Sequence, residues 1–268
     1  MADLWAFSKG MTIYCLALAA LLGAVLASFS GCVAARLRTG ESFLRGRSHC
    51  DRCGHVLAAG DLVPVFSWLL RKGRCRYCGA QIPASCPITE ALEGLTFAVL
   101  LWHYGLTAAG GQAIILAALL FLISLIDWET GIIPDSLVLA VCADFAVFTA
   151  VSAGWRAVGM GALGGLMLGG GMLVLALMMD RVLGRESMGG GDIKLFFAVG
   201  LFFPWSQLLL LLIFSCVIGI VVNLLTAKTT EDPDNPKAFP FGPAIAAGTI
   251  LTLLWGTPIL NWYLGLFL

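Results

Sequence analysis

Apolar runs separated by short polar segments make up most of the chain, and one long polar stretch follows the first run. The runs cover residues 11–35, 91–106, 112–127, 136–153, 157–182, 193–204, 206–226 and 240–267. A helix of about 20 apolar residues crosses the roughly 30 Å hydrocarbon core of a bilayer. The pattern therefore predicts an all-α polytopic membrane protein with about eight transmembrane helices, of which the second, third and sixth are short.

The composition strengthens this interpretation. Hydrophobic residues account for 59% of the 268 residues and charged residues for 12%, and the mean hydropathy is +0.93. A soluble core of this length could not bury so much apolar surface, whereas membrane lipid accommodates it. The 16 basic and 16 acidic residues cancel, so the net charge gives no support to a nucleic-acid partner.

The positions of the basic residues predict the orientation in the membrane. If the N-terminus lies outside and the spans alternate, all but two of the 16 Lys and Arg residues fall in cytoplasmic loops or at cytoplasmic span ends. The exceptions are Lys9 and Arg156, while Lys228 and Lys237 are among the cytoplasmic set. Because cytoplasmic loops are enriched in Lys and Arg, we expect the polar stretch at residues 36–87 to lie in the cytoplasm.

The polar stretch contains two Cys-x-x-Cys pairs, each followed by a glycine, and a turn of this kind presents two thiolates to one tetrahedral metal ion. Two such pairs predict a closed, structural zinc site with four ligands: Cys50, Cys53, Cys75 and Cys78. The alternatives are redox-active or unpaired thiols, or a site in which a neighbour replaces one cysteine. The candidates for that replacement are His49, His55 and Cys86.

These features divide the chain into three parts. Residues 1–35 are expected to form the first transmembrane helix, residues 36–87 a small zinc-binding domain inserted after it, and residues 88–268 the remaining transmembrane domain. The inserted domain has few apolar residues for a core, so the metal is expected to supply much of its folding free energy.

Charged residues at membrane depth are costly and are candidates for functional sites. The candidates are Glu90, Glu93, Asp127, Asp135, Asp144 and Asp192. Asp127 ends the third predicted span, and Asp192 follows three glycines just before the sixth. In the predicted topology both lie at the cytoplasmic boundary of the membrane.

Two aspartates brought together there would suit an aspartic protease. Adjacent carboxylates share one proton because two neighbouring negative charges repel. The ionised partner can deprotonate water while the protonated partner polarises the scissile carbonyl group. The glycines before Asp192 would let an extended peptide approach the backbone. The alternative for each aspartate is a helix cap or an interfacial charge.

Several motifs extend this picture to most of the chain, from about residue 27 to residue 244. They are the two Cys-x-x-Cys pairs, Pro87-Ile88-Thr89-Glu90, Ile126-Asp127 followed by Ile133-Pro134-Asp135, Glu186-x-Met188-Gly189-x-Gly191-Asp192-Ile193-Lys194, and Pro240-Phe241-Gly242-Pro243. In this combination the chain resembles the bacterial type IV prepilin peptidases, a branch of the intramembrane aspartic proteases with a Gly-x-Gly-Asp motif.

The resemblance implies a function. Family members sit in the bacterial inner membrane and cleave the short basic leader of prepilins and pseudopilins at the cytoplasmic face, and many then methylate the new N-terminal residue with S-adenosylmethionine. By position, Asp127 and Asp192 match the catalytic aspartates, with Gly189, Gly191, Asp135 and Lys194 as supporting motif residues. Asp135 is also the second candidate for the first catalytic position.

Glu90 and Glu93 are expected contacts for a basic leader side chain or for the released amine. The sequence leaves open the choice between type IV pilins and type II secretion pseudopilins, and the oligomeric state. Two other classes of function also remain. A membrane scaffold would use the cysteine domain to bind a partner, and a transporter would use the acidic residues as a proton relay.

Overall fold

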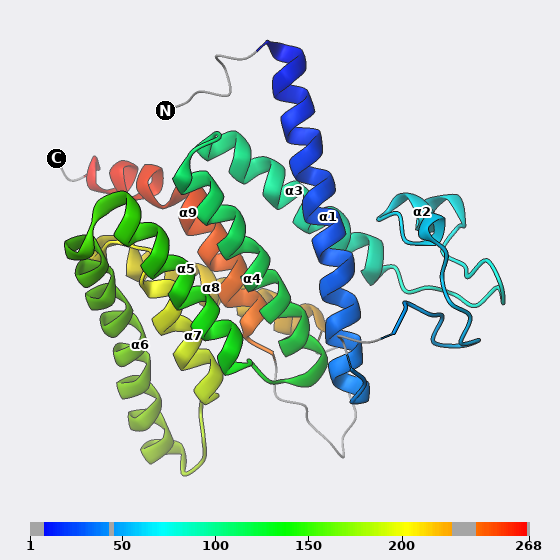
Figure 1. Ribbon diagram of the computed structural model, residues 1–268. Helices are drawn as coiled ribbons and strands as arrows, with labels where there is room; N and C mark the ends of the chain where they lie inside the picture. Colours follow the sequence, from blue (N-terminus) through cyan, green and yellow to red (C-terminus); the bar gives the residue numbers. More distant parts are fainter. Residues whose placement is uncertain (1–7, 43–45, 227–239, 267–268) are drawn as a thin grey trace. The chain divides into compact units, whose positions relative to one another are not determined.

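The computed structural model describes residues 8–42, 46–226 and 240–266 of the chain, and these residues are mainly helical (Figure 1). The elements are α1 (Lys9–Thr39), η2 (Ala59–Asp61), α2 (Phe66–Leu70), α3 (Ser85–Tyr104), α4 (Ala108–Thr130), α5 (Asp135–Ala153), α6 (Trp155–Leu183), α7 (Gly190–Gly200), α8 (Trp205–Thr226) and α9 (Gly242–Leu264). Extended pairing within the described residues is limited to two isolated bridges. The predicted all-α fold is confirmed.

Each of the eight apolar runs forms a helix, and six of these helices are long and apolar enough to cross a membrane: α1, α4, α5, α6, α8 and α9. The chain is therefore a multi-pass membrane protein. Of the other two, α3 carries Glu90 and Glu93 in its N-terminal half. Helix α7 has 11 residues, which span roughly 16 Å and fall short of the hydrocarbon core. The count of about eight spans is thus approximate.

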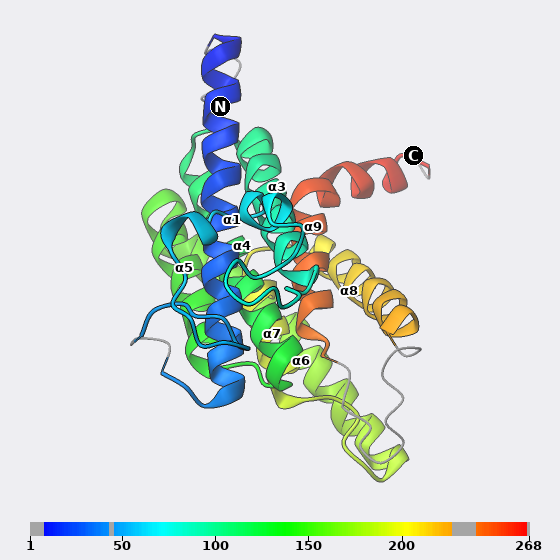
Figure 2. The ribbon, with the colours of Figure 1, turned by 90° about the vertical axis from the view of Figure 1, so that its right-hand side faces the viewer.

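The ends of the helices refine the predicted spans. Helix α4 continues to Thr130, so Asp127 lies inside its last turn. The last span contains Pro258 within one continuous helix, and Figure 2 shows α9 bending toward its C-terminal end. A proline inside a helix removes one backbone hydrogen bond and favours such a bend. Arg45, Lys228 and Lys237, which belong to the predicted cytoplasmic set, lie outside the described residues.

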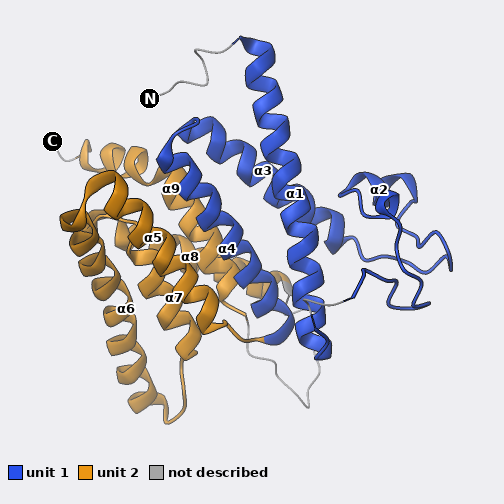
Figure 3. Ribbon diagram, viewed as in Figure 1, with its two compact units in different colours: residues 1–130 blue, residues 131–268 orange. Residues whose placement is uncertain are grey.

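The chain forms two compact units, Met1–Thr130 and Gly131–Leu268 (Figure 3). The first contains α1 to α4 and the second α5 to α9. The boundaries predicted at residues 35 and 87 separate the cysteine-bearing segment from the membrane helices. The division into two compact units does not test these boundaries, so they stay a prediction.

In the first unit, α1 packs against both α3 and α4, and two glycines allow α1 and α3 to cross at close range. A Cβ atom at Gly23 would lie 2.7 Å from the backbone oxygen of Glu93, and one at Gly94 would lie 2.7 Å from that of Ala20. Any larger residue would push the helices apart. Lipid is as apolar as leucine, so helices in a membrane associate through such close backbone packing.

In the second unit, too, helices approach each other closely at glycines. Helix α6 contacts α7 through Gly164, Gly165 and Gly169, whose Cβ atoms would come within 2.9 Å of α7 or of the segment that follows it. Helix α8 contacts α9 where a Cβ atom at Gly248 would meet Ser215. Three glycines of the glycine-rich segment at residues 160–171 therefore let α6 pack closely against α7.

Helix α1 offers a matched test of this packing. We expect Gly23→Ala to lower the free energy of unfolding by about 1–3 kcal/mol, because the new methyl group overlaps the α3 backbone. Gly31→Ala, on the same helix with nothing within 4 Å of its Cβ position, is expected to leave stability unchanged or raise it slightly, since alanine favours helix. Thermal unfolding of the two purified variants in detergent measures the difference, and equal melting temperatures would contradict the close approach.

Candidate metal centre and carboxylate site

Four cysteines form a cluster between α1 and α3. The sulfur atoms of Cys50, Cys53, Cys75 and Cys78 all lie within 4.8 Å of one another, and the Cys50 and Cys78 sulfurs are 3.9 Å apart. Tetrahedral coordination with metal–sulfur bonds of about 2.3 Å separates sulfurs by about 3.8 Å. The four thiols thus fit a single metal ion, whereas His49, His55 and Cys86 are not part of the cluster.

The backbone builds the two halves of this cluster in the same way. The Cys50 N–H donates to the His55 carbonyl at 3.0 Å, and the Gly54 N–H donates to the Cys50 carbonyl at 2.8 Å. Gly54 has a φ of 67°, in the left-handed region that glycine tolerates. The second half repeats both hydrogen bonds and the left-handed glycine at the equivalent positions, which are Cys75, Gly79 and Ala80. The glycine after each pair is therefore required by the turn.

The electrostatics of the thiols differ across the cluster. Hydrogen bonds from the backbone N–H groups of Cys53 and Arg52 lower the pKa of the Cys50 thiol to about 7. At Cys78 the Ala80 backbone also favours the thiolate, but desolvation and the neighbouring thiols outweigh it and raise the pKa to about 11. Four thiolates this close repel one another, so a cation is needed to hold them all ionised.

Asp61 lies outside the cluster and stabilises the backbone around it. Its carboxylate forms an ion pair with Arg71 at 2.7 Å, and it accepts hydrogen bonds from the Ala58 backbone and the Tyr77 hydroxyl, each at 3.1 Å. Desolvation opposes its ionisation, but these partners prevail and lower the pKa of Asp61. These contacts of Asp61 connect η2, the end of α2 and the second cysteine pair.

Glu90 attaches the cysteine segment to α3. Its carboxylate accepts the Val65 N–H at 2.6 Å. Val65 has φ 60° and ψ −52°, and the N–H of the next residue, Phe66, donates to the Pro64 carbonyl at 2.6 Å, which makes a γ-turn. A residue other than glycine keeps this strained conformation only where its surroundings stabilise it. The hydrogen bond to Glu90 stabilises it at Val65.

Glu93 lies one turn further along α3. Only 2% of the residue is exposed, and its Oε1 atom is buried without a hydrogen-bond partner among the described residues. Contact of Glu90 and Glu93 with a substrate amine stays a prediction, but their surroundings differ: Glu90 is engaged within its own unit, and Glu93 is enclosed by helices.

The two predicted catalytic aspartates belong to different units. Asp127 lies near the end of α4 and is 5% exposed. Asp192 is half-buried in the first turn of α7. A helix N-terminus favours a negative charge because the first N–H groups point toward it. One carboxylate oxygen of Asp192 would be 3.1 Å from a Cβ atom at Gly189, so glycine leaves room for this carboxylate.

Two motif segments that are distant in the sequence meet within the second unit. A Cβ atom at Gly191 would lie 3.1 Å from the Cβ atom of Ile133, and the Lys194 ammonium group forms an ion pair with Asp135 at 2.8 Å. The segment that leads into α5 therefore packs against the start of α7. Asp144, by contrast, is 8% exposed in mid-helix, and its carboxylate oxygens find no hydrogen-bond partner in the described part of the chain.

Sequence reasoning did not anticipate three of these contacts: Asp61 with Arg71, Glu90 with Val65, and Asp135 with Lys194. Asp135 and Lys194 are 59 residues apart, Glu90 contacts a backbone group 25 residues away, and the Asp61–Arg71 pair lies in a segment without regular spacing of charges. The only signal was that Asp135 and Lys194 both stood inside recognisable motifs.

The fold and the cysteine cluster together define the class of protein. It is a polytopic membrane protein with a metal-binding segment inserted after its first helix. Residues 21–104 match the family model of the bacterial peptidase A24 N-terminal domain, and residues 114–224 match that of the type IV leader peptidase family. With the relatives described next, these matches show that the chain belongs to the type IV leader peptidase family.

Proteins named prepilin leader peptidase/N-methyltransferase match most of the chain. That of Myxococcus xanthus is 33% identical over 245 residues, which are 88% of this chain and 70% of the relative. That of Aeromonas salmonicida is 33% identical over 229 residues, or 83% and 76% of the two chains. That of Bacillus subtilis is 29% identical over 246 residues, or 91% and 96%. No solved structure matches the chain significantly.

The metal centre makes a direct prediction. The purified protein should carry about one metal ion per chain, and Cys75→Ser should lose it, because three thiolates no longer close a tetrahedral site. Cys86→Ser, which changes an exposed thiol outside the cluster, should retain it. Elemental analysis by mass spectrometry measures the content, and equal metal in both variants would rule out the four-cysteine site.

Proposed function

We propose that this chain is a prepilin leader peptidase that cleaves the short basic leader of prepilins or pseudopilins, with Asp127 and Asp192 as the catalytic dyad. The observation that carries the proposal is the Gly189–Asp192 segment, which places a carboxylate at the start of α7 in a chain of the type IV leader peptidase family. The relatives' names supply the substrate class.

The dyad would hydrolyse the peptide bond with water as the nucleophile. The ionised aspartate takes a proton from water, and the oxygen attacks the scissile carbonyl carbon while the protonated aspartate donates a hydrogen bond to the carbonyl oxygen. The tetrahedral intermediate then collapses. Its C–N bond breaks, and the carboxyl group that took the proton returns it to the leaving amine. The leader leaves with a new carboxyl end, and the mature pilin with a new amino end.

The proposed location is the cytoplasmic face of the bacterial inner membrane. A basic leader is retained on the cytoplasmic side by the rule that sorts the Lys and Arg residues of this chain. The apolar segment after the leader enters the membrane, so the scissile bond lies at the boundary. In the proposed topology Asp127 and Asp192 both reach that boundary.

We propose zinc as the metal of the cysteine cluster, because four thiolates in a tetrahedral arrangement select it over harder cations. The ion would be structural, since four protein ligands leave no open position for substrate or water. Its role would be to hold the segment at residues 36–87 folded, together with the polar contacts of Asp61 and Glu90.

The dyad can be tested by cleavage of a purified prepilin in detergent. Asp127→Asn and Asp192→Asn should each reduce leader removal by at least about 1,000-fold, because an amide can neither accept a proton from water nor share one. Product mass measures the cleavage. Asp135→Asn should still cleave, which separates Asp127 from the second candidate for its position.

Glu41→Gln, at an exposed carboxylate after α1, is the control for a simple loss of charge. Normal cleavage by both Asp127→Asn and Asp192→Asn would overturn the protease assignment and favour a scaffold that only binds its partner through the cysteine segment.

We further propose that the enzyme methylates the new amino terminus with S-adenosylmethionine, as the names of its relatives indicate. With this cofactor present, the mature product should gain the mass of one methyl group. Asp192→Asn should yield no methylated product from the intact prepilin, because the acceptor amine is not released. A product of unchanged mass in the presence of S-adenosylmethionine would show that the chain is a peptidase alone.

A further inference from the structure

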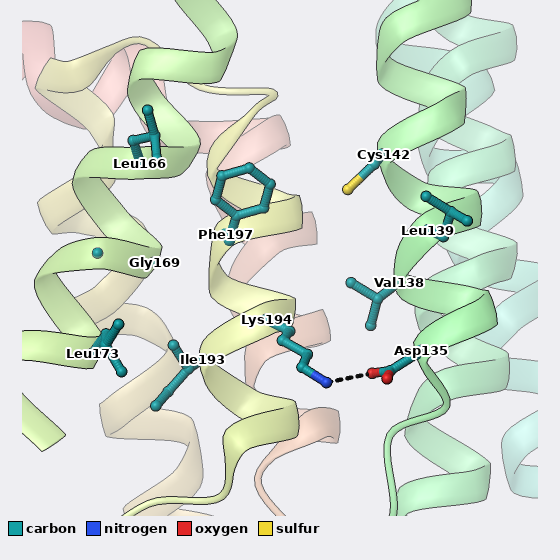
Figure 4. Close-up of a pocket in the computed structure, with 11 residues that line it drawn as sticks. Asp135, Val138, Leu139, Cys142, Leu166, Gly169, Leu173, Ile193, Lys194 and Phe197 are labelled. Atoms are coloured by element: carbon teal, nitrogen blue, oxygen red, sulfur yellow. Dashed lines mark hydrogen bonds and ion pairs between the residues drawn. The ribbon is translucent and has the colours of Figure 1, made fainter. Parts of the chain in front are cut away.

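A groove of about 600 Å³ lies within the second unit, between α5, α6 and α7. Figure 4 shows the side chains that face it from the three helices. Its walls are almost entirely apolar, and Val138, Leu139, Leu166, Leu173 and Phe197 form most of them. None of these residues has a role in the dyad. Because α5 and α6 are candidate membrane spans, lipid is the occupant with which any other must be compared.

The groove has one polar end. Figure 4 shows Asp135 of α5 and Lys194 of α7 close to Val138 and Ile193, whereas Leu166, Phe197 and Cys142 lie further along the helices. The Asp135–Lys194 ion pair spans α5 and α7 at 2.8 Å, and both side chains are more than half exposed. The groove thus passes from a charged end into an apolar body.

The charged end adjoins the proposed catalytic residue on the same helix. Ile193 and Lys194 directly follow Asp192 in the first turns of α7, and both line the groove. The groove therefore begins within one helical turn of Asp192, although Asp192 does not itself line it. The order of surfaces, polar and then apolar, matches a substrate whose polar leader is followed by an apolar segment.

The floor of the groove favours a helix as its occupant. Gly169 and Gly170 of α6 both line it. Gly169 is used by the contact with Phe197, but a Cβ atom at Gly170 would meet nothing within 4 Å, so bare backbone faces the groove there. Small residues on a membrane helix allow a second helix to approach closely. A lipid chain can also pack against this surface, and the experiments below distinguish it from a helix.

We propose that this groove binds the apolar helical segment of the substrate that directly follows the scissile bond. The Asp135–Lys194 pair then marks the boundary between leader and apolar segment, and Gly170 is a specificity-determining position. This inference rests on the proposed peptidase function, and it adds a substrate-binding surface that is separate from the two aspartates.

Two neighbouring glycines provide the test. Gly170→Leu places a side chain in the groove, while Gly171→Leu changes the next residue of the same helix, which does not line the groove; neither Cβ position has a neighbour within 4 Å. Each enzyme is given a full-length prepilin and a short peptide that keeps the leader and scissile bond but lacks most of the apolar segment. The ratio of kcat/KM for the long over the short substrate should fall about tenfold in Gly170→Leu and stay at the wild-type value in Gly171→Leu.

A contact measurement complements the kinetics. Cys142 lines the groove, so a prepilin with a single cysteine in its apolar segment should form a disulfide with it under a membrane-permeant oxidant. The experiment uses Asp192→Asn to keep the substrate intact. The cross-link should disappear in the Asp192→Asn, Cys142→Ala double variant, and a cross-link that persists there would contradict the groove assignment.

The ways in which these experiments can fail are distinguishable. If the wild-type enzyme cleaves neither substrate, the proposed function fails and this inference with it. If the wild-type enzyme cleaves both but Gly170→Leu and Gly171→Leu keep the same substrate ratio, only the groove assignment is overturned. The groove assignment is also overturned if native mass spectrometry finds a bound phospholipid that Gly170→Leu expels while cleavage is unchanged, because the occupant is then a lipid.

Discussion

Close backbone approach between helices is the constraint on which the rest of this structure depends. In lipid, apolar side chains gain little by leaving one apolar surface for another, so the helices must be held by contact at short range. Gly23 and Gly94 provide it between α1 and α3, and Gly164 and Gly169 provide it between α6 and α7. The short helix α7, which carries Asp192, thereby gains a fixed position against a much longer neighbour.

The cysteine segment is stabilised in a different way, because it has few apolar residues with which to form a core. Its order comes instead from the two matching turns around the cysteines and from individual polar contacts. Arg36 of α1 donates to the carbonyl groups of Ser42 and Arg47, and Glu90 of α3 accepts from Val65. A metal ion would join the two halves, so the segment is held at both of its ends and at its centre.

The same packing that fixes α7 also assembles the surface beside Asp192. Gly191 allows Ile133 to pack against the start of α7, and this contact places Asp135 within reach of Lys194. The ion pair and the apolar groove next to it are consequences of one approach between α5 and α7. Substrate binding and the position of Asp192, as proposed, would therefore depend on a single local arrangement of motif residues within the second unit, whereas Asp127 belongs to the first.

The sequence by itself determined the helices, the membrane class, the four cysteines and the family, because apolar run length, Cys-x-x-Cys spacing and motif order are properties of the chain alone. Only the tertiary structure decided what the remaining charged residues contact. Glu90 accepts a backbone N–H from 25 residues away, Lys194 meets Asp135 across 59 residues, and Gly170 faces open space while Gly169 does not. These outcomes depend on how helices cross, and no local pattern encodes the partner that a crossing brings within reach.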